Sequence, residues 1–310
     1  MLYPAELRGH GTGLYHSCVQ VLMARRGQAK KRGTRDMMRG MQLRKGPTGG
    51  MILAAALFLC VCPVGPGVAE AEPDCPVPPG QEIVVTRATA GGTLITADGA
   101  EIVLGGLAFP EVADPGSESD GLAAMIDAVV QLGTGTLHIA AEGPPDRYGR
   151  LHGDAYLPDG RWLQAELVTA GVARVRPDGR SPPCVRALLA RESIARNAGT
   201  GLWSDSNFRV KSADDPSLLA RNGLYDLVEG RVVSVGYGSR MVFLDFGRDF
   251  RTDFTVMVPN TLVPRLLEAG IALETSEGRA VRVRGVVEDS GGPAIRIADP
   301  FALEILDRAE

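Results

Sequence analysis

The sequence predicts a mainly β protein with helices (α+β), built from two small β-barrels in tandem. Two observations support this prediction. Short β-like runs separated by turn residues occur in two sets, and each set also contains helical segments. A polar segment at residues 206–222, which contains Asp214-Asp215-Pro216, separates the sets and predicts a linker. The chain has 310 residues, which is enough for two such domains.

The first set is expected to form a domain at residues 72–205. Its expected strands are 82–87, 92–96, 101–107, 134–140, 151–157 and 172–175. Ala97-Asp98-Gly99 is a hairpin turn signal between the second and third of these strands. Pro158-Asp159-Gly160 predicts a turn at the end of the fifth strand.

Three helices are expected within the same set. Residues 121–131 have apolar residues at helical spacing. Residues 163–170 predict a short helix, because Gly171 lies just past its end, where a terminating glycine is common. Ser181-Pro182-Pro183 begins the third helix with residue types that a first turn tolerates, and Gly199 follows its end. This order of elements predicts a small closed barrel with helices on one side.

The second set is expected to form a domain at residues 223–307. Its expected elements are strands 227–235, 241–246 and 254–258, helix 261–269, and strands 280–288, 294–297 and 301–306. A helix between the third and fourth strands is the order of an OB-type barrel, so a second small OB-like β-barrel is expected. Its segment 244–254 alternates Phe with Arg and Asp. This segment is either an aromatic and basic surface for single strands, or a strand, turn and strand with Phe246 and Phe254 in the core.

The N-terminus has the three-part pattern of a secretory signal peptide. Arg44 and Lys45 precede an apolar run at residues 51–59, and Ala69-Glu70-Ala71 supplies small residues where a signal peptidase cleaves. We therefore expect export to the periplasm or cell envelope of a bacterium, with an uncleaved membrane anchor as the alternative. No clean apolar stretch of about 18 residues lies beyond the signal, which predicts no membrane span after cleavage. Residues 1–36 fit no part of the pattern, so we expect the true start to lie downstream of them.

Removal of residues 1–71 leaves an acidic protein. These residues hold 10 of the 33 basic and 3 of the 37 acidic residues, so 23 basic and 34 acidic residues remain, a net charge of −11. Non-specific phosphate binding depends on Lys and Arg. A nucleic acid is therefore expected to bind only at a local basic patch.

Two cysteines of the five, Cys75 and Cys184, remain after cleavage at Ala71. An even pair in an exported protein predicts a disulfide, and two unpaired thiols are the alternative. The bridge would tie the mature N-terminus to the third helix.

The most specific run in the chain is Asp146-Arg147-Tyr148-Gly149-Arg150, which leads into the expected strand 151–157. Later runs are Glu166-Leu167-Val168-Thr169-Ala170-Gly171-Val172-Ala173-Arg174-Val175 and Gly201-Leu202-Trp203. In this order they resemble the staphylococcal nuclease (thermonuclease) family, over residues 81–205. The resemblance implies a staphylococcal-nuclease-type OB barrel with flanking helices.

The resemblance also implies calcium-dependent hydrolysis of DNA and RNA phosphodiesters. The family site holds Ca²⁺ with two aspartates and a carbonyl, which suits an ion that takes oxygen ligands. A glutamate acts on water, and two arginines bind the phosphate and stabilise charge. The family glutamate matches Glu111 and the second arginine matches Arg150, with Arg147 as a further phosphate-binding group. Arg150 has an alternative structural role, in which it pairs with Asp146 across the turn.

Three of the five key side chains are absent from this sequence. Gly92 and Ala108 stand where the family has its calcium-binding aspartates, and Val103 stands where it has the first arginine. We therefore expect no cofactor, and Ca²⁺ only if activity is retained. The resulting hypothesis is a degenerate nuclease domain that binds single-stranded nucleic acid or an envelope protein. The alternative is a divergent, active calcium-dependent endonuclease. His138 and His152 are isolated in the sequence and are expected to be structural or exposed.

Overall fold

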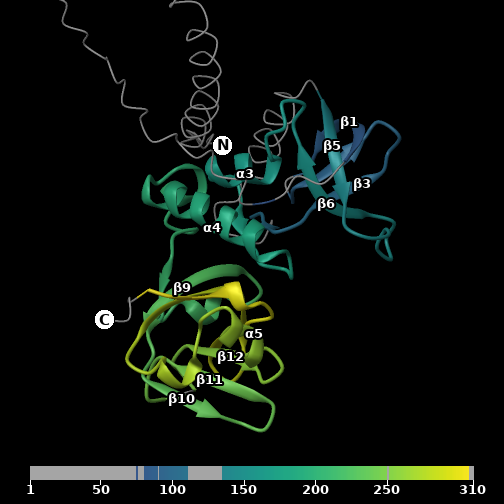
Figure 1. Cartoon of the computed structure of the whole chain (residues 1–310). Helices are drawn as coiled ribbons and strands as arrows, with labels where there is room; N and C mark the ends of the chain where they lie inside the picture. The colour runs from purple at the N-terminus through teal and green to yellow at the C-terminus, as the bar shows by residue number, and fades with distance from the viewer. Residues whose placement is uncertain (1–74, 76–79, 90, 111–134, 250, 307–310) are drawn as a thin grey trace, which may run out of the picture.

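A computed structural model of the chain describes residue 75 and residues 80–89, 91–110, 135–249 and 251–306. The predicted helix 121–131, the candidate residue Glu111 and the predicted signal segment 1–71 lie outside these residues. Two β-rich units lie against each other (Figure 1). None of the helices in the described residues has the length and apolar character needed to cross a membrane.

Five strands form the barrel of the first unit. They are β1 (Gln81–Ala88), β2 (Thr93–Thr96), β3 (Glu101–Leu104), β5 (Thr136–Ala141) and β6 (Leu151–Tyr156). The barrel closes in the order β1-β2-β3-β6-β5, and all neighbours are antiparallel except β3 and β6, which are parallel. Alternate residues of β2 and β3 point inward, so Leu94 and Ile102 are fully buried. The predicted mainly β fold with a closed barrel is confirmed.

The third expected strand is divided in two. After β3 the chain turns, and β4 (Leu107–Ala108) pairs with β7 (Arg174–Val175) outside the barrel. Gly105 and Gly106 form the break. Gly106 has a φ of +78°, and the Arg180 side chain packs so closely across both glycines that β-carbons there would lie 2.7 and 2.8 Å from it.

Helices lie on one side of this barrel (Figure 1). They are α3 (Leu163–Thr169), α4 (Pro182–Asn197) and the short 3-10 helix η1 (Gly201–Ser204). The chain after α3 contacts the chain before η1 backbone to backbone, since a β-carbon on Gly171 would lie 2.2 Å from the carbonyl oxygen of Thr200. The N–H of Leu202 donates to the carbonyl of Gly171 at 2.8 Å. Close packing of the backbone therefore requires glycine at both Gly171 and Gly201.

The second unit contains an eight-stranded sheet. Its strands are β8 (Lys211–Ser212), β9 (Tyr225–Arg231), β10 (Ser234–Tyr237), β11 (Met241–Asp245), β12 (Thr255–Pro259), β13 (Ala280–Asp289), β14 (Pro293–Arg296) and β15 (Leu303–Ile305). Its helices are α5 (Val263–Glu268) and the 3-10 turns η2 (Leu218–Arg221), η3 (Leu273–Thr275) and η4 (Pro300–Ala302). Phe246 and Phe254 are buried with ring centroids 5.2 Å apart, which confirms the structural interpretation of their segment.

The two units share one pattern of strand pairing, although their sequences show no repeat. In the second unit, β10, β11 and β12 are antiparallel neighbours, β12 pairs parallel with β14, and β14 pairs with β13, which returns to β9. In the first unit, β3 likewise pairs in parallel with β6, the last strand of the barrel in chain order. The assignment of the second unit to the OB type stays a prediction.

The segment predicted as a linker, residues 206–222, connects the units but is folded. β8 pairs in parallel with β9, and the side chains of Phe208 and Leu218 are buried. Arg221 is buried as well and forms an ion pair with Asp226. Leu218 belongs to the core of the second unit, and the Phe208 ring lies beside Arg174 of the first unit, so the connecting segment is packed rather than flexible.

Candidate functional site

The loop at residues 146–150 forms around the carboxylate of Asp146. One oxygen, Oδ1, accepts hydrogen bonds from the N–H groups of Tyr148 and Arg150 at 2.8 and 3.0 Å. The other, Oδ2, accepts from Nε and Nη2 of Arg150 at 2.9 and 2.8 Å. Gly149 has a φ of +80°, which lets the chain turn within these residues. The structural pairing of Asp146 with Arg150 is therefore present.

His152 also contacts this carboxylate, with Nε2 3.1 Å from Oδ2 of Asp146. Desolvation opposes ionisation of Asp146, but hydrogen bonds from Arg150, His152 and Tyr148 outweigh it and hold the pKa of this carboxyl well below its usual range. The contact between His152 and Asp146 could not be predicted from the sequence, because His152 reaches Asp146 only once the turn is closed.

The tip of the loop presents an aromatic ring and two guanidinium groups. Tyr148 is 66% exposed. The guanidinium carbons of Arg147 and Arg150 lie 4.7 and 5.1 Å from the centre of its ring. The Arg150 side chain keeps 35% of its surface exposed although it pairs with Asp146. The loop can therefore offer cations and a flat apolar face to a ligand.

Gly92 occupies a position with no room for a side chain. Its φ is +76°, and a β-carbon added there would lie 2.0 Å from the ring of Phe109. The ring fills the space into which an aspartate side chain would have to extend. The packing around Gly92 therefore leaves no room for a carboxylate side chain at this position.

Replacing Gly92 by alanine is expected to lower the free energy of unfolding. The positive φ contributes about 1 kcal/mol or more, and displacement of the Phe109 ring adds about 1–3 kcal/mol. Gly99 is a matched control, because its φ is +86° but nothing lies within 4 Å of an added β-carbon. Denaturant unfolding of Gly92→Ala and Gly99→Ala measures the difference. Equal losses in the two variants would contradict the proposed steric conflict.

The other two positions without the family's side chains are Val103, which lies on a strand, and Ala108, which lies in a buried cluster. Val103 on β3 pairs with His152 on β6, beside the 146–150 loop. Ala108 is 6% exposed and belongs to a cluster with Trp203 of the first unit and with Tyr225 and Leu227 of the second. The second unit thus helps to enclose Ala108, the position that the resemblance assigns to the family's second aspartate.

Calcium needs several oxygen ligands at one place. Neither Gly92 nor Ala108 can supply one from a side chain, and no group of three or more His, Cys, Asp or Glu among the described residues could hold a metal ion. Glu111 lies outside the described residues. The described residues at the matched positions therefore do not fit the family's calcium ion.

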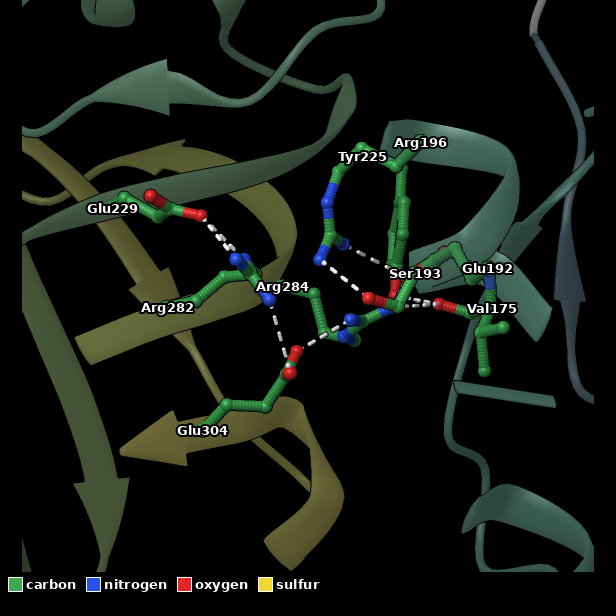
Figure 2. Close-up of polar contacts among 9 residues, drawn as sticks. All are labelled: Val175, Glu192, Ser193, Arg196, Tyr225, Glu229, Arg282, Arg284 and Glu304. Carbon is green, nitrogen blue, oxygen red and sulfur yellow. Dashed lines mark hydrogen bonds and ion pairs between the residues drawn. The ribbon is translucent and has the colours of Figure 1, made fainter. Parts of the chain in front are cut away.

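A buried ion network joins the two units around Glu192 of α4 (Figure 2). Its Oε2 accepts from Nη1 of Arg284 at 2.8 Å, and its Oε1 accepts from the N–H of Val175 at 2.7 Å. Nη2 of Arg284 donates to Glu304 at 2.6 Å, and the hydroxyl of Tyr225 donates to the carbonyl of Val175 at 2.9 Å. Burial alone would lower the pKa of Arg284, but the carboxylates of Glu192 and Glu304 outweigh it and raise that pKa.

A second buried network lies at Arg174, within one of the family-like runs. Its guanidinium is 3.4 Å from the carboxylate of Asp226, and both side chains are fully buried. Arg221 forms a further ion pair with the same carboxylate. The Arg174 guanidinium also lies 5.5 Å from the ring centres of Phe208 and Tyr225. These buried ion pairs could not be predicted from the sequence, since the partners lie in the other unit or in the connecting segment.

Cys75 and Cys184 form a disulfide across 109 residues of sequence. Cys184 lies in the first turn of α4, and both cysteines are buried. The bridge therefore attaches the chain before the barrel to the helix that carries Glu192.

Comparison with known proteins matches the part of the first unit from β3 to η1. Residues 102–205 match the family model described as staphylococcal nuclease homologue. Two curated relatives, each called "Uncharacterized endonuclease", come from Escherichia coli O157:H7 and Escherichia coli. Each is 39% identical over 62 residues, which is 20% of this chain and 39% of the relative. The chain thus spans about two fifths of the length of these curated relatives.

The matched residues coincide with structural features described above. They begin in β3, include the 146–150 loop and end just after η1, so the second unit lies outside the match. The closed barrel, the loop around Asp146 and the glycine contacts near η1 all agree with it. The chain therefore contains, at residues 102–205, a domain of the staphylococcal nuclease homologue family.

Proposed function

We propose that this domain binds single-stranded nucleic acid through the 146–150 loop and does not cleave it. The observation that carries the proposal is the filling of two cation-ligand positions: the Phe109 ring occupies the space beside Gly92, and Ala108 is enclosed at the domain interface. Loss of both carboxylates removes most of the charge that holds Ca²⁺ in this family. Loss of the arginine at Val103 removes a charge-assisted contact to phosphate.

The exposed loop provides the chemistry for binding. Arg147 and Arg150 supply guanidinium groups that can donate paired hydrogen bonds to a phosphate. The exposed ring of Tyr148 supplies a face on which a base can stack, a contact that tolerates any sequence. Because the chain after residue 71 has a net charge of −11, attraction to nucleic acid requires a local basic patch such as this loop and falls with added salt.

The alternative function is an active, divergent calcium-dependent endonuclease. It is favoured by the names of the two relatives, which are called endonucleases. It is also favoured by the presence of Glu111 and Arg150 at matched positions. In that case Glu111 and carbonyl oxygens would hold the cation without the two aspartates.

Incubation of the mature protein with single-stranded DNA and RNA, with Ca²⁺ or with chelator, distinguishes these functions. We expect binding at low salt without cleavage. Replacing Arg147 and Arg150 together by alanine is expected to weaken binding about tenfold or more, and to reduce the slope of log K against log salt by about 1.4. Arg161→Ala is the control, because Arg161 is exposed on the turn at the other end of β6 and already paired with Asp159 and Glu166.

Each other outcome of this experiment favours a different function. Chelator-sensitive cleavage that disappears in Arg150→Ala and Glu111→Gln would overturn the proposal in favour of the endonuclease. Absence of binding to DNA and RNA at low salt would favour an envelope protein as the partner.

We further propose that the protein is exported and acts in the periplasm or cell envelope. The disulfide between Cys75 and Cys184 supports this, because disulfides persist in oxidising compartments. N-terminal sequencing of the exported protein is expected to give a start near residue 72. A product that retains residues before Met37 would contradict the proposed start, and one that retains residues 51–59 would indicate an anchor.

A further inference from the structure

A pocket of about 300 Å³ lies on the outer face of the second unit. The strand register explains its composition. Phe243 of β11 pairs with Met257 of β12, and Asp245 of β11 pairs with Thr255 of β12, so all four side chains point to the same face of the sheet. The turn between β13 and β14 closes one side, where Ser290 Oγ lies 3.7 Å from Met257 Sδ.

The apolar part of the pocket depends on Phe243. Its ring lies against two glycines of the neighbouring hairpin, since a β-carbon on Gly238 would lie 3.2 Å from the ring and one on Gly236 would lie 3.8 Å from its Cβ. A β-carbon at Gly238 would be in tight contact with the ring, and one at Gly236 would be in ordinary van der Waals contact with the Phe243 side chain. One face of Phe243 is thereby supported by backbone, and Met257 and Ala294 extend the apolar lining.

The polar part of the pocket is a carboxylate held in place. Asp245 Oδ1 accepts from the hydroxyl of Thr255 at 3.1 Å, and Oδ2 accepts from the hydroxyl of Ser234 at 3.3 Å. Asp245 is the one charged residue among the described residues that line the pocket. Arg296 pairs with Met257 in register, but it forms its ion pair with Glu288 at 3.3 Å.

We propose that this pocket binds an organic cation, an alkylammonium or guanidinium group on an apolar stem. A carboxylate beside an aromatic face and a thioether suits such a group, because the ring face attracts cations and the apolar lining covers the stem. The same lining disfavours a phosphate, which would meet the Asp245 charge without a cationic partner. The cation is either a free amine or a Lys or Arg side chain of a peptide. This inference is independent of nucleic-acid binding by the first domain.

Titration of the full mature chain, with the Met methyl groups labelled with ¹³C, tests the proposal by NMR. The probes are n-hexylammonium, a capped tripeptide with a central Lys, hexanoate and an oligothymidylate. Hexylammonium and the peptide are expected to shift the Met257 methyl signal saturably, whereas hexanoate and the oligonucleotide are not. Saturation by one of the two cations at much lower concentration identifies the source as a free amine or a peptide.

Two variants of pocket residues and one control variant outside the pocket test the specificity of binding. Asp245→Asn preserves the hydrogen-bonding shape and is expected to weaken binding of the cations about tenfold or more. Phe243→Leu keeps apolar volume and is expected to weaken it several-fold by removing the ring face. Glu268→Gln, on the exposed side of α5, removes the same charge outside the pocket and is expected to change nothing. Binding unaffected by Asp245→Asn, stronger binding of hexanoate or oligothymidylate, or no saturable shift with either cation would overturn the proposal.

Discussion

Replacing Glu192 by alanine is expected to lower the free energy of unfolding by about 3–5 kcal/mol. The side chain is fully buried, and its removal leaves the Arg284 guanidinium and the N–H of Val175 without the partners at 2.8 and 2.7 Å. The buried Arg284 charge would then be balanced by Glu304 alone, whereas its desolvation cost would remain. Denaturant unfolding followed by the fluorescence of Trp203, which lies in the same interface, measures the loss.

The exposed pair between Arg296 and Glu288 provides the control. Its side chains are 54% and 37% exposed and 3.3 Å apart, so Glu288→Ala is expected to cost at most about 1 kcal/mol. The double variant Glu192→Leu/Arg284→Met is expected to be more stable than Glu192→Ala, because it removes both charges together. A loss in Glu192→Ala no larger than that in Glu288→Ala would contradict the view that the network holds the units together.

Removing the disulfide is expected to destabilise the mature protein by about 2–5 kcal/mol. The bridge closes a long loop, with a separation of 109 residues between Cys75 and Cys184, and long loops gain most from closure in the chain-entropy model. The measurement compares thermal or denaturant unfolding of the oxidised protein with that of Cys75→Ser/Cys184→Ser.

Reductant serves as the internal control for this second prediction. Residues 72–310 contain no other cysteine, so in a protein that begins at residue 72 reductant should lower the stability to that of the double variant and leave the variant unchanged. Equal stability of the oxidised and reduced protein would show that the bridge does not constrain the unfolded chain.

Both predictions concern α4, because this helix carries a residue of the disulfide and a residue of the interdomain ion network. Its first turn carries Cys184 of the disulfide, and its third turn carries Glu192 of the interdomain network. The enclosure of Ala108 depends on the same interface, because Tyr225 and Leu227 come from the second unit. Weakening the network is therefore expected to loosen the packing around one of the substituted ligand positions.

Much of the fold follows from local features of the sequence. The expected helix at residues 261–269 is observed as α5, and the expected strand at residues 254–258 is observed as β12. Turn residues and apolar periodicity act over a few residues, so they identify elements without knowledge of the fold. The division of the third strand at Gly105 and Gly106 was missed, because it depends on Arg180, which arrives from a distant turn.

Some features of the candidate site could likewise be predicted from the sequence, and others could not. Asp146 and Arg150 are four residues apart, so their pairing across a tight turn follows from sequence spacing. The absence of carboxylates at Gly92 and Ala108 is also visible in the sequence. That the ring of Phe109 fills the space beside Gly92 could not be predicted, since it depends on how β4 leaves the barrel.

The sequence by itself determined the two sets of strands and helices, the runs that resemble one nuclease family, and the side chains missing from that family's site. The tertiary structure alone decided that the two units are joined through buried ion pairs and that a carboxylate-bearing pocket forms on the second unit. Arg284 and Glu192 are separated by 92 residues, and Arg174 and Asp226 by 52. A buried charge is tolerated only where a partner meets it, and such a meeting depends on long-range packing that no local pattern encodes.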